Sequence, residues 1–235
     1  MAHRTLFALS FPRCGPPELS PQPGARPTAR RGPLSASDPI RAAGTPPTPA
    51  SAGPAPRMPD GGRHPFASRV PPGVVPEVPG LGCESVWDYP RPPRLEPVPA
   101  RIRVVVDGVA IADTTRAFRV LETSHAPAYY LPPGDVRMEL LRRSSTSSVC
   151  EWKGVASYWS LETMARRIPD LAWSYDRPSP GFEAIRGHLA FYASKADEAW
   201  VGDERATPQA GGFYGGWMTS RIAGPVKGEP GSRGW

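Results

Sequence analysis

The distribution of proline and tryptophan divides this chain into two unlike parts. Of its 33 prolines, 24 precede Arg101, whereas all seven tryptophans lie at or after Trp87. A segment rich in Pro, Ala, Gly, Ser and Arg that lacks tryptophan cannot bury enough apolar surface to offset its ordering entropy. We therefore predict that residues 1–83 form a disordered Pro/Ala/Arg-rich tail and that residues 84–235 form a single domain.

The net charge follows the same division. Residues 1–83 carry nine arginines and four acidic residues, a net charge of +5, and residues 84–235 carry a net charge of +1. A basic chain indicates a nucleic-acid partner only when its positive charge gathers on a folded surface. Because the predicted domain is nearly neutral, we expect no nucleic-acid partner.

Three further features bound the class of protein. No apolar run approaches the roughly 18 residues that a membrane-spanning helix needs, so no membrane partner is expected. Cys150 is predicted to be a buried thiol in a reducing compartment, which favours a cytoplasmic protein. Translation from Met58 would remove residues 1–57, and this alternative to a functional tail stays open.

Short alternating apolar segments predict a mainly β domain. The clearest signal is an Asp-Gly pair between the apolar residues 102–106 and 109–113. This pair is typical of a type I′ hairpin, because both turn residues need positive φ. A two-residue turn would place Val104 opposite Ile111, with both on the half-buried face.

The remaining segments predict more strands and one short helix. Ser179 as N-cap, Pro180 in the first turn and Gly187 at the end predict a helix with Phe182 and Ile185 on its buried side. The segment after residue 210 is rich in Gly and aromatic residues and is predicted to be coil that covers the sheet. Further strands are predicted at residues 117–122, 136–142, 147–151, 155–161, 172–175, 189–192 and 199–201.

Four separated blocks resemble one known family. In chain order they are VLETSHAPAYYLPPGDVRMELL, CEWKGVASYW, AWSY and HLAFY. Their set and order are similar to the domain-of-unknown-function 427 family, over roughly residue 84 to the C-terminus. The resemblance implies a small, mostly β domain of β-tent, Mss4-like topology with short antiparallel strands. It implies no settled activity, although a nucleotidyltransferase-like label is sometimes attached to the family.

The resemblance also raises the question of a metal. Tent-like relatives often hold a structural zinc ion through two Cys-x-x-Cys pairs. This sequence has no such pair, so no metal ligand is expected. No cofactor can be assigned from the sequence.

Titratable and aromatic side chains are densest between Thr123 and Trp159. His125 is the single histidine of this stretch and could act as a general acid or base near neutral pH. Asp135, which follows a Pro-Pro turn, could orient the imidazole. The alternative is a loop histidine that hydrogen-bonds to the backbone.

Lys153 precedes a glycine at a predicted break between two strands. Its ammonium could meet an anionic ligand there, and the alternative is a solvated lysine in a turn. Most of the aromatic side chains are expected to fill the core, and the remainder could line a pocket for a planar ligand. The candidate ligand-binding residues are Tyr129, Tyr130, Lys153, Tyr158, Trp173 and Tyr175.

The leading hypothesis is a small-molecule-binding β domain with an aromatic and polar pocket and no assignable reaction. One alternative is a nucleotidyltransferase-like or other enzyme that acts on a phosphorylated metabolite, with Lys153 on the phosphate and His125 as acid or base. Another is a protein-interaction module with an exposed patch of Phe213, Tyr214 and Trp217. The sequence leaves open whether the protein is an enzyme and what its oligomeric state is.

Overall fold

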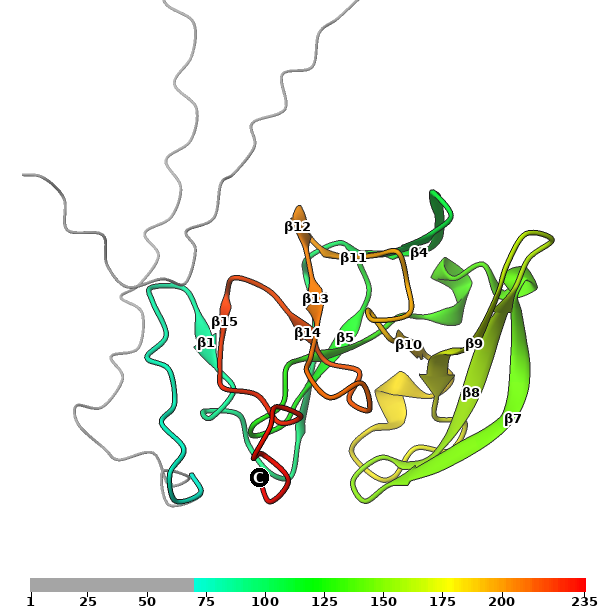
Figure 1. Ribbon diagram of the computed structural model, residues 1–235. Coiled ribbons are helices and arrows are strands. Elements are labelled where there is room, and N and C mark those ends of the chain that lie inside the picture. The colour runs from blue at the N-terminus through cyan, green and yellow to red at the C-terminus, as the bar shows by residue number, and fades with distance from the viewer. Residues whose placement is uncertain (1–69) are drawn as a thin grey trace, which may run out of the picture. The chain divides into compact units, whose positions relative to one another are not determined.

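The computed structural model describes residues 70–235 (Figure 1). The predicted disorder of the first 69 residues and the alternative start at Met58 lie outside the described part. Within it, the chain forms fifteen strands and three single-turn 3₁₀ helices. The prediction of a mainly β domain is confirmed. No helix in residues 70–235 is long and apolar enough to cross a membrane.

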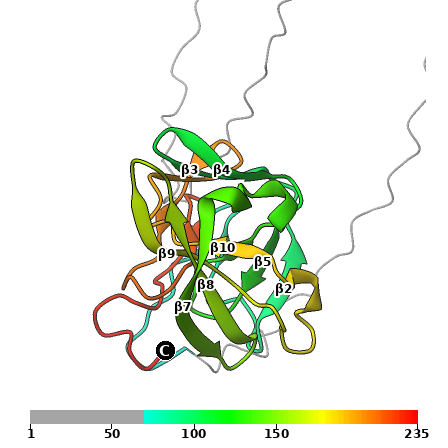
Figure 2. The same ribbon diagram turned by 90° about the vertical axis from the view of Figure 1, so that its right-hand side faces the viewer.

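One four-stranded antiparallel sheet has the strand order β10-β9-β8-β7 (Figure 2). Its turn between β7 and β8 lies where the sequence predicts it, and Gly154 at this turn has a φ of 95°, a conformation that favours glycine. Along β8 the side chains alternate, so Tyr158 and Trp159 pack into different hydrophobic clusters. The strands are β7 (Leu141–Cys150), β8 (Gly154–Glu162), β9 (Arg167–Ser174) and β10 (Leu189–Phe191).

A second four-stranded sheet contains the predicted hairpin. Asp107 and Gly108 both have positive φ, 51° and 73°, as the type I′ turn requires. The predicted pairing of Val104 with Ile111 is wrong. A β-bulge between Val104 and Val105 shifts the register, so that Val104 pairs with Ala112. The extra residue, Ile111, is thereby buried beside Ala112. The strands, in sheet order, are β12 (Glu204–Arg205), β11 (Glu198–Val201), β3 (Ile102–Val106) and β4 (Val109–Thr114).

A three-stranded antiparallel sheet connects these elements to the first sheet. A single bridge between Leu131 and Leu189 places the end of β6 beside β10. Successive side chains of β6 point to opposite faces, so Tyr129 joins the largest hydrophobic cluster and Tyr130 joins a second one. The strands, in sheet order, are β2 (Arg94–Pro97), β5 (Phe118–Leu121) and β6 (Ala128–Tyr130).

The C-terminal segment forms short strands where coil is predicted. Trp217 on β14 is completely buried, and its Nε1 donates a hydrogen bond of 2.9 Å to the carbonyl of Phe191. Residues 70–83, which the sequence assigns to the tail, contact this segment: the Glu77 amide donates to the Gly224 carbonyl at 2.9 Å. The paired strands are β1 (Glu84–Ser85) with β15 (Ile222–Ala223) and β13 (Thr207–Pro208) with β14 (Trp217–Met218).

Two predicted elements are corrected by the structure. The predicted helix at residues 179–187 is reduced to one 3₁₀ turn, because the Gly187 amide donates to the Tyr175 carbonyl and returns the chain to β10. Of the predicted strand at residues 136–142, Val136 forms a single bridge to Ala112, a 3₁₀ turn follows, and strand pairing begins at Leu141, the first residue of β7. The 3₁₀ helices are η2 (Pro133–Asp135), η3 (Met138–Leu140) and η4 (Glu183–Ile185).

Candidate functional site

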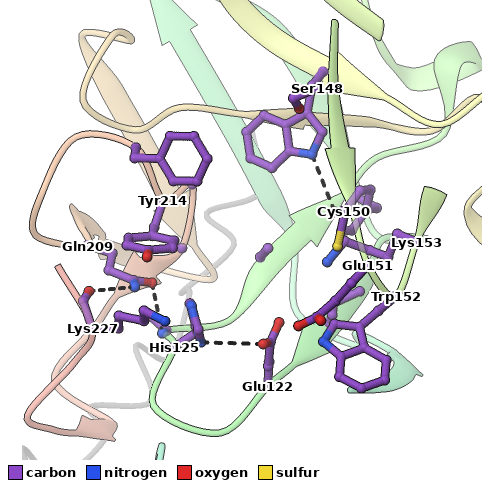
Figure 3. Close-up of a pocket in the computed structure, with 18 of the residues that line it drawn as sticks. Glu122, His125, Ser148, Cys150, Glu151, Trp152, Lys153, Gln209, Tyr214 and Lys227 are labelled. Atoms are coloured by element: carbon purple, nitrogen blue, oxygen red, sulfur yellow. Dashed lines mark hydrogen bonds and ion pairs between the residues drawn. The ribbon is translucent and has the colours of Figure 1, made fainter. Parts of the chain in front are cut away.

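A cavity of about 490 Å³ opens between the β7–β8 turn, β9, β6 and the C-terminal segment (Figure 3). This volume lies within the range of small-molecule sites. Its walls combine aromatic rings with a few polar groups, and they come from parts of the chain far apart in sequence. The principal lining residues are Arg91, Glu122, His125, Tyr130, Cys150, Trp152, Lys153, Tyr158, Trp173, Tyr175, Tyr192, Gln209, Tyr214 and Lys227.

Six of the eight residues predicted for the site line this one cavity. Pairing between β8 and β9 sets Tyr158 opposite Trp173, so both rings enter the cavity from the same face of the sheet. The outward side of β6 supplies Tyr130. The six are His125, Tyr130, Lys153, Tyr158, Trp173 and Tyr175.

The other two predicted residues lie elsewhere. Tyr129 faces the core, where its ring centroid lies 5.2 Å from that of Trp217. The carboxylate of Asp135 accepts hydrogen bonds from Thr114 Oγ1 at 2.6 Å and from Arg116 Nη2 at 2.7 Å. Asp135 therefore anchors its own turn to β4, and the predicted pairing with the imidazole is not found.

Lys153 is the most unusual group of the cavity, because its side chain is charged and its exposed fraction is only 8%. The Ser179 amide donates to its carbonyl at 3.1 Å, and this bond fixes the β7–β8 turn. Burial disfavours the ammonium, but the electrostatic effect of Tyr130, Cys150 and Glu122 outweighs it and raises the pKa of Lys153.

The carboxylate that acts on Lys153 is committed to other partners. Glu122 Oε1 lies 3.2 Å from Arg91 Nη2 and 3.9 Å from His125 Nδ1. Within residues 70–235, no ion pair joins Lys153 to a carboxylate at 4.0 Å or less. The Lys153 amine thus lines the cavity without a direct acidic partner in the described part.

Aromatic side chains form the wall that faces this lysine. The rings of Trp173 and Tyr192 lie 4.6 Å apart, and Trp173 Nε1 donates a weak hydrogen bond of 3.4 Å to the Tyr130 hydroxyl. Burial raises the pKa of Tyr130, as it does for Tyr175 and Tyr192. These phenols are therefore neutral hydrogen-bond donors near pH 7.

His125 lies toward the C-terminal side of the cavity. Its Nδ1 is 2.9 Å from the Thr123 carbonyl, which favours the tautomer with a proton on Nδ1. The ring also packs edge-on against Tyr214, with centroids 5.0 Å apart. Burial lowers the pKa of His125, so the imidazole is neutral at pH 7 and its Nε2 is basic.

The C-terminal segment closes one side of the cavity through contacts that no local pattern reveals. The Gln209 side chain accepts from the Ala126 amide at 3.0 Å and donates to the Lys227 carbonyl at 2.8 Å. A Cβ atom at Gly215 would lie 2.0 Å from Cη2 of Trp173, so only glycine permits this approach. Sequence reasoning missed these residues because Gln209 reaches Ala126 across 83 positions and Gly215 contacts a tryptophan far from it in the chain.

The predicted interaction patch is only partly present. Phe213 is 70% exposed, but Trp217 is completely buried. Tyr214 is half-buried against His125. Two of the three rings of the predicted patch are therefore not exposed.

The fold and site together define a small, mainly β domain with an aromatic cavity and a buried lysine. The model of the family described as "Domain of unknown function (DUF427)" matches residues 94–202. This part of the chain is thus similar to the family that the sequence blocks resemble. No curated protein matches the chain. The match includes the cavity residues from Glu122 to Tyr192, whereas Gln209, Tyr214 and Lys227 lie beyond it.

Proposed function

We propose that this domain binds a small, flat organic anion in the cavity. The observation that carries the proposal is Lys153, a buried ammonium whose neighbouring carboxylate, Glu122, pairs with Arg91. Burying a charge without a direct partner costs free energy, and a bound anion would offset that cost. The ligand thus supplies the acidic partner that the lysine lacks.

The aromatic walls support a flat ligand. Trp173, Tyr158 and Tyr192 present ring faces and edges to the cavity, which favour stacked or edge-on contact with another ring. The volume of about 490 Å³ accommodates a ring system with one or two substituents. The chemical class is therefore an aromatic or conjugated acid.

Calorimetric titration of the purified full chain with 2-naphthoate and with its neutral analogue 2-naphthamide tests this proposal. Naphthoate should bind at least ten-fold more tightly than the amide, and Lys153→Met should remove this preference, a loss of about 1.4 kcal/mol. Arg137→Met is the control, since that guanidinium pairs with Glu139 on the surface and does not line the cavity. Equal affinities of the wild type for acid and amide would refute the role of the lysine.

A second candidate function rests on the presence of His125 in the same cavity. A neutral imidazole with a basic Nε2 could act as general acid or base on a phosphorylated metabolite whose phosphate binds Lys153. Thermal unfolding with nucleotides, with and without Mg²⁺, tests this alternative. A nucleotide that raises Tm and is converted to product would support it, and a complete lack of stabilisation would exclude it.

A further inference from the structure

The inner end of the cavity gathers hydrogen-bond donors. Tyr130 and Tyr175 lie with ring centroids 6.2 Å apart and are 1% and 4% exposed. Lys153 acts electrostatically on Tyr130, and both line the cavity. Figure 3 shows Lys153 beside Cys150 on the wall formed by the β7–β8 turn. Two hydroxyls and an ammonium therefore border the same space.

Hydrogen-bond capacity at this end is unequal. The Tyr130 oxygen accepts from Trp173 Nε1, a group that can only donate, and also hydrogen-bonds to Tyr175. Tyr175 and Lys153 each hydrogen-bond to the thiol of Cys150. An ammonium contributes three donors and no acceptor, and a thiol such as Cys150 accepts only weakly. Donors thus exceed strong acceptors, and buried donors are costly unless an acceptor satisfies them. An oxygen that can take several hydrogen bonds on one atom would be a stronger acceptor for these donors than the thiol.

The arrangement favours a single oxygen over a carboxylate or phosphate. A carboxylate or a phosphate, which presents two oxygens side by side, is best bound by the two parallel donors of a guanidinium. The guanidinium that lines the cavity, Arg91, already binds Glu122 at 3.2 Å and the Thr123 carbonyl at 2.9 Å. Phenol hydroxyls and a lysine instead resemble donors that converge on one oxyanion.

We propose that Tyr130, Tyr175 and Lys153 form an oxyanion site that selects the ionised form of a phenol or enol whose ring lies against Trp173. This inference rests on the proposed function and narrows its ligand class from organic anions in general to acidic hydroxyl compounds. A preference for the oxyanion requires that binding lowers the pKa of the ligand's hydroxyl group, since the site interacts more strongly with the charged form.

The other titratable groups that face the cavity do not oppose the preference for a bound oxyanion. Glu122 forms an ion pair with Arg91, Glu151 is exposed to solvent, and the imidazole of His125 is uncharged. Lys227 donates to the carbonyl of Trp235 on the C-terminal side. Tyr158 and Tyr192 add further hydroxyls, and Tyr158 shares a hydrogen bond of 2.9 Å with Ser148. Lys153 therefore provides the uncompensated charge at the inner end.

The test uses 4-nitrophenol, whose phenolate absorbs visible light and whose neutral form does not. Absorbance is titrated against pH with the full chain in excess, and the ionised-to-neutral ratio of the bound probe is compared with that of the free probe. We expect at least a ten-fold increase in this ratio. Lys153→Met should abolish the increase, and Tyr130→Phe and Tyr175→Phe, which remove only a hydroxyl, should each reduce it at least two-fold.

A parallel titration with 4-nitrobenzoate separates this inference from the proposed function. If the benzoate binds through Lys153 while the nitrophenol binds with an unchanged ratio or does not bind, the oxyanion site is refuted and the anion site stands. If neither probe binds, both proposals fail. Should Lys153→Met not fold, as judged by circular dichroism, the two Phe variants decide: an unchanged ratio in both refutes the site.

Discussion

Tyr129 and Tyr130 adjoin in sequence, yet their rings lie on opposite sides of β6. The Tyr129 ring lies 5.2 Å from that of Trp217 in the main core, whereas the Tyr130 hydroxyl lines the cavity and accepts from Trp173. This division follows from the two-residue repeat of a strand. Neighbouring positions of one strand therefore contribute to the main core and to the cavity.

The first prediction compares the two tyrosines. Tyr129→Ala should lower the free energy of unfolding by about 3–5 kcal/mol, because it leaves a cavity in a packed core. Tyr130→Phe keeps the ring and should cost about 1 kcal/mol, while it weakens ligand binding. Urea denaturation and calorimetric titration of both variants measure these effects. Unchanged ligand affinity in Tyr130→Phe would contradict the assignment of its hydroxyl to the cavity.

The second prediction concerns Gly215. Gly215→Ala forces the C-terminal segment away from the Trp173 ring, and it should destabilise the protein by about 1–3 kcal/mol. Gly134→Ala is the control, because a Cβ atom there meets nothing within 4 Å and the backbone φ is not positive. Urea denaturation followed by tryptophan fluorescence measures both. Equal unfolding midpoints of the two variants would show that the segment does not pack on the ring.

The third prediction is a loss of stability at alkaline pH. Burial raises the pKa of Tyr129 to about 12 from an ordinary value of 10.0. Below pH 10 both the folded and unfolded states keep the proton, so the full stability is present. Between pH 10 and about 12 only the unfolded chain loses it, and the stability falls. Urea denaturation across pH 8–11 should show this decline, with a smaller slope in Tyr129→Phe; identical slopes would contradict the burial of its hydroxyl.

The fourth prediction concerns His125 on the acid side. Burial lowers its pKa below the ordinary 6.5, so the stability it contributes is present above that value and is lost as pH falls through the folded-state pKa. The difference in unfolding free energy between wild type and His125→Gln should therefore shrink from pH 7 to pH 5. Most carboxylates do not titrate in this window. A constant difference across it would show that the imidazole is not buried in its neutral form.

Local patterns predicted much of the fold but not its long-range register. The Asp107-Gly108 turn requires positive φ at both positions, and Asp and Gly are residue types that adopt it readily. The bulge that brings Ile111 and Ala112 inward depends on what the strand packs against, so alternation alone misplaced the pairing. Likewise the segment starting at Ser179 carries helix signals, but its bonds to Tyr175 leave room for one turn.

The sequence predicted most of the residues that line the candidate site, but not how they are arranged. Dense aromatic and titratable blocks pointed to Lys153 and His125, and both line the cavity. Which of Tyr129 and Tyr130 lines the cavity depends on which side of β6 faces the core. The partner of Asp135 depends on where β4 lies. Residues of the C-terminal segment close the cavity through contacts distant in sequence, for which the chain offers no local signal.

The most direct test of the central claim is a crystal structure of the full chain with 2-naphthoate at saturating concentration. The carboxylate is expected to lie within roughly 4 Å of the Lys153 ammonium, close enough for a direct ion pair, with the ring against Trp173. A naphthoate bound outside this cavity, or an empty cavity beside measurable binding in solution, would contradict it.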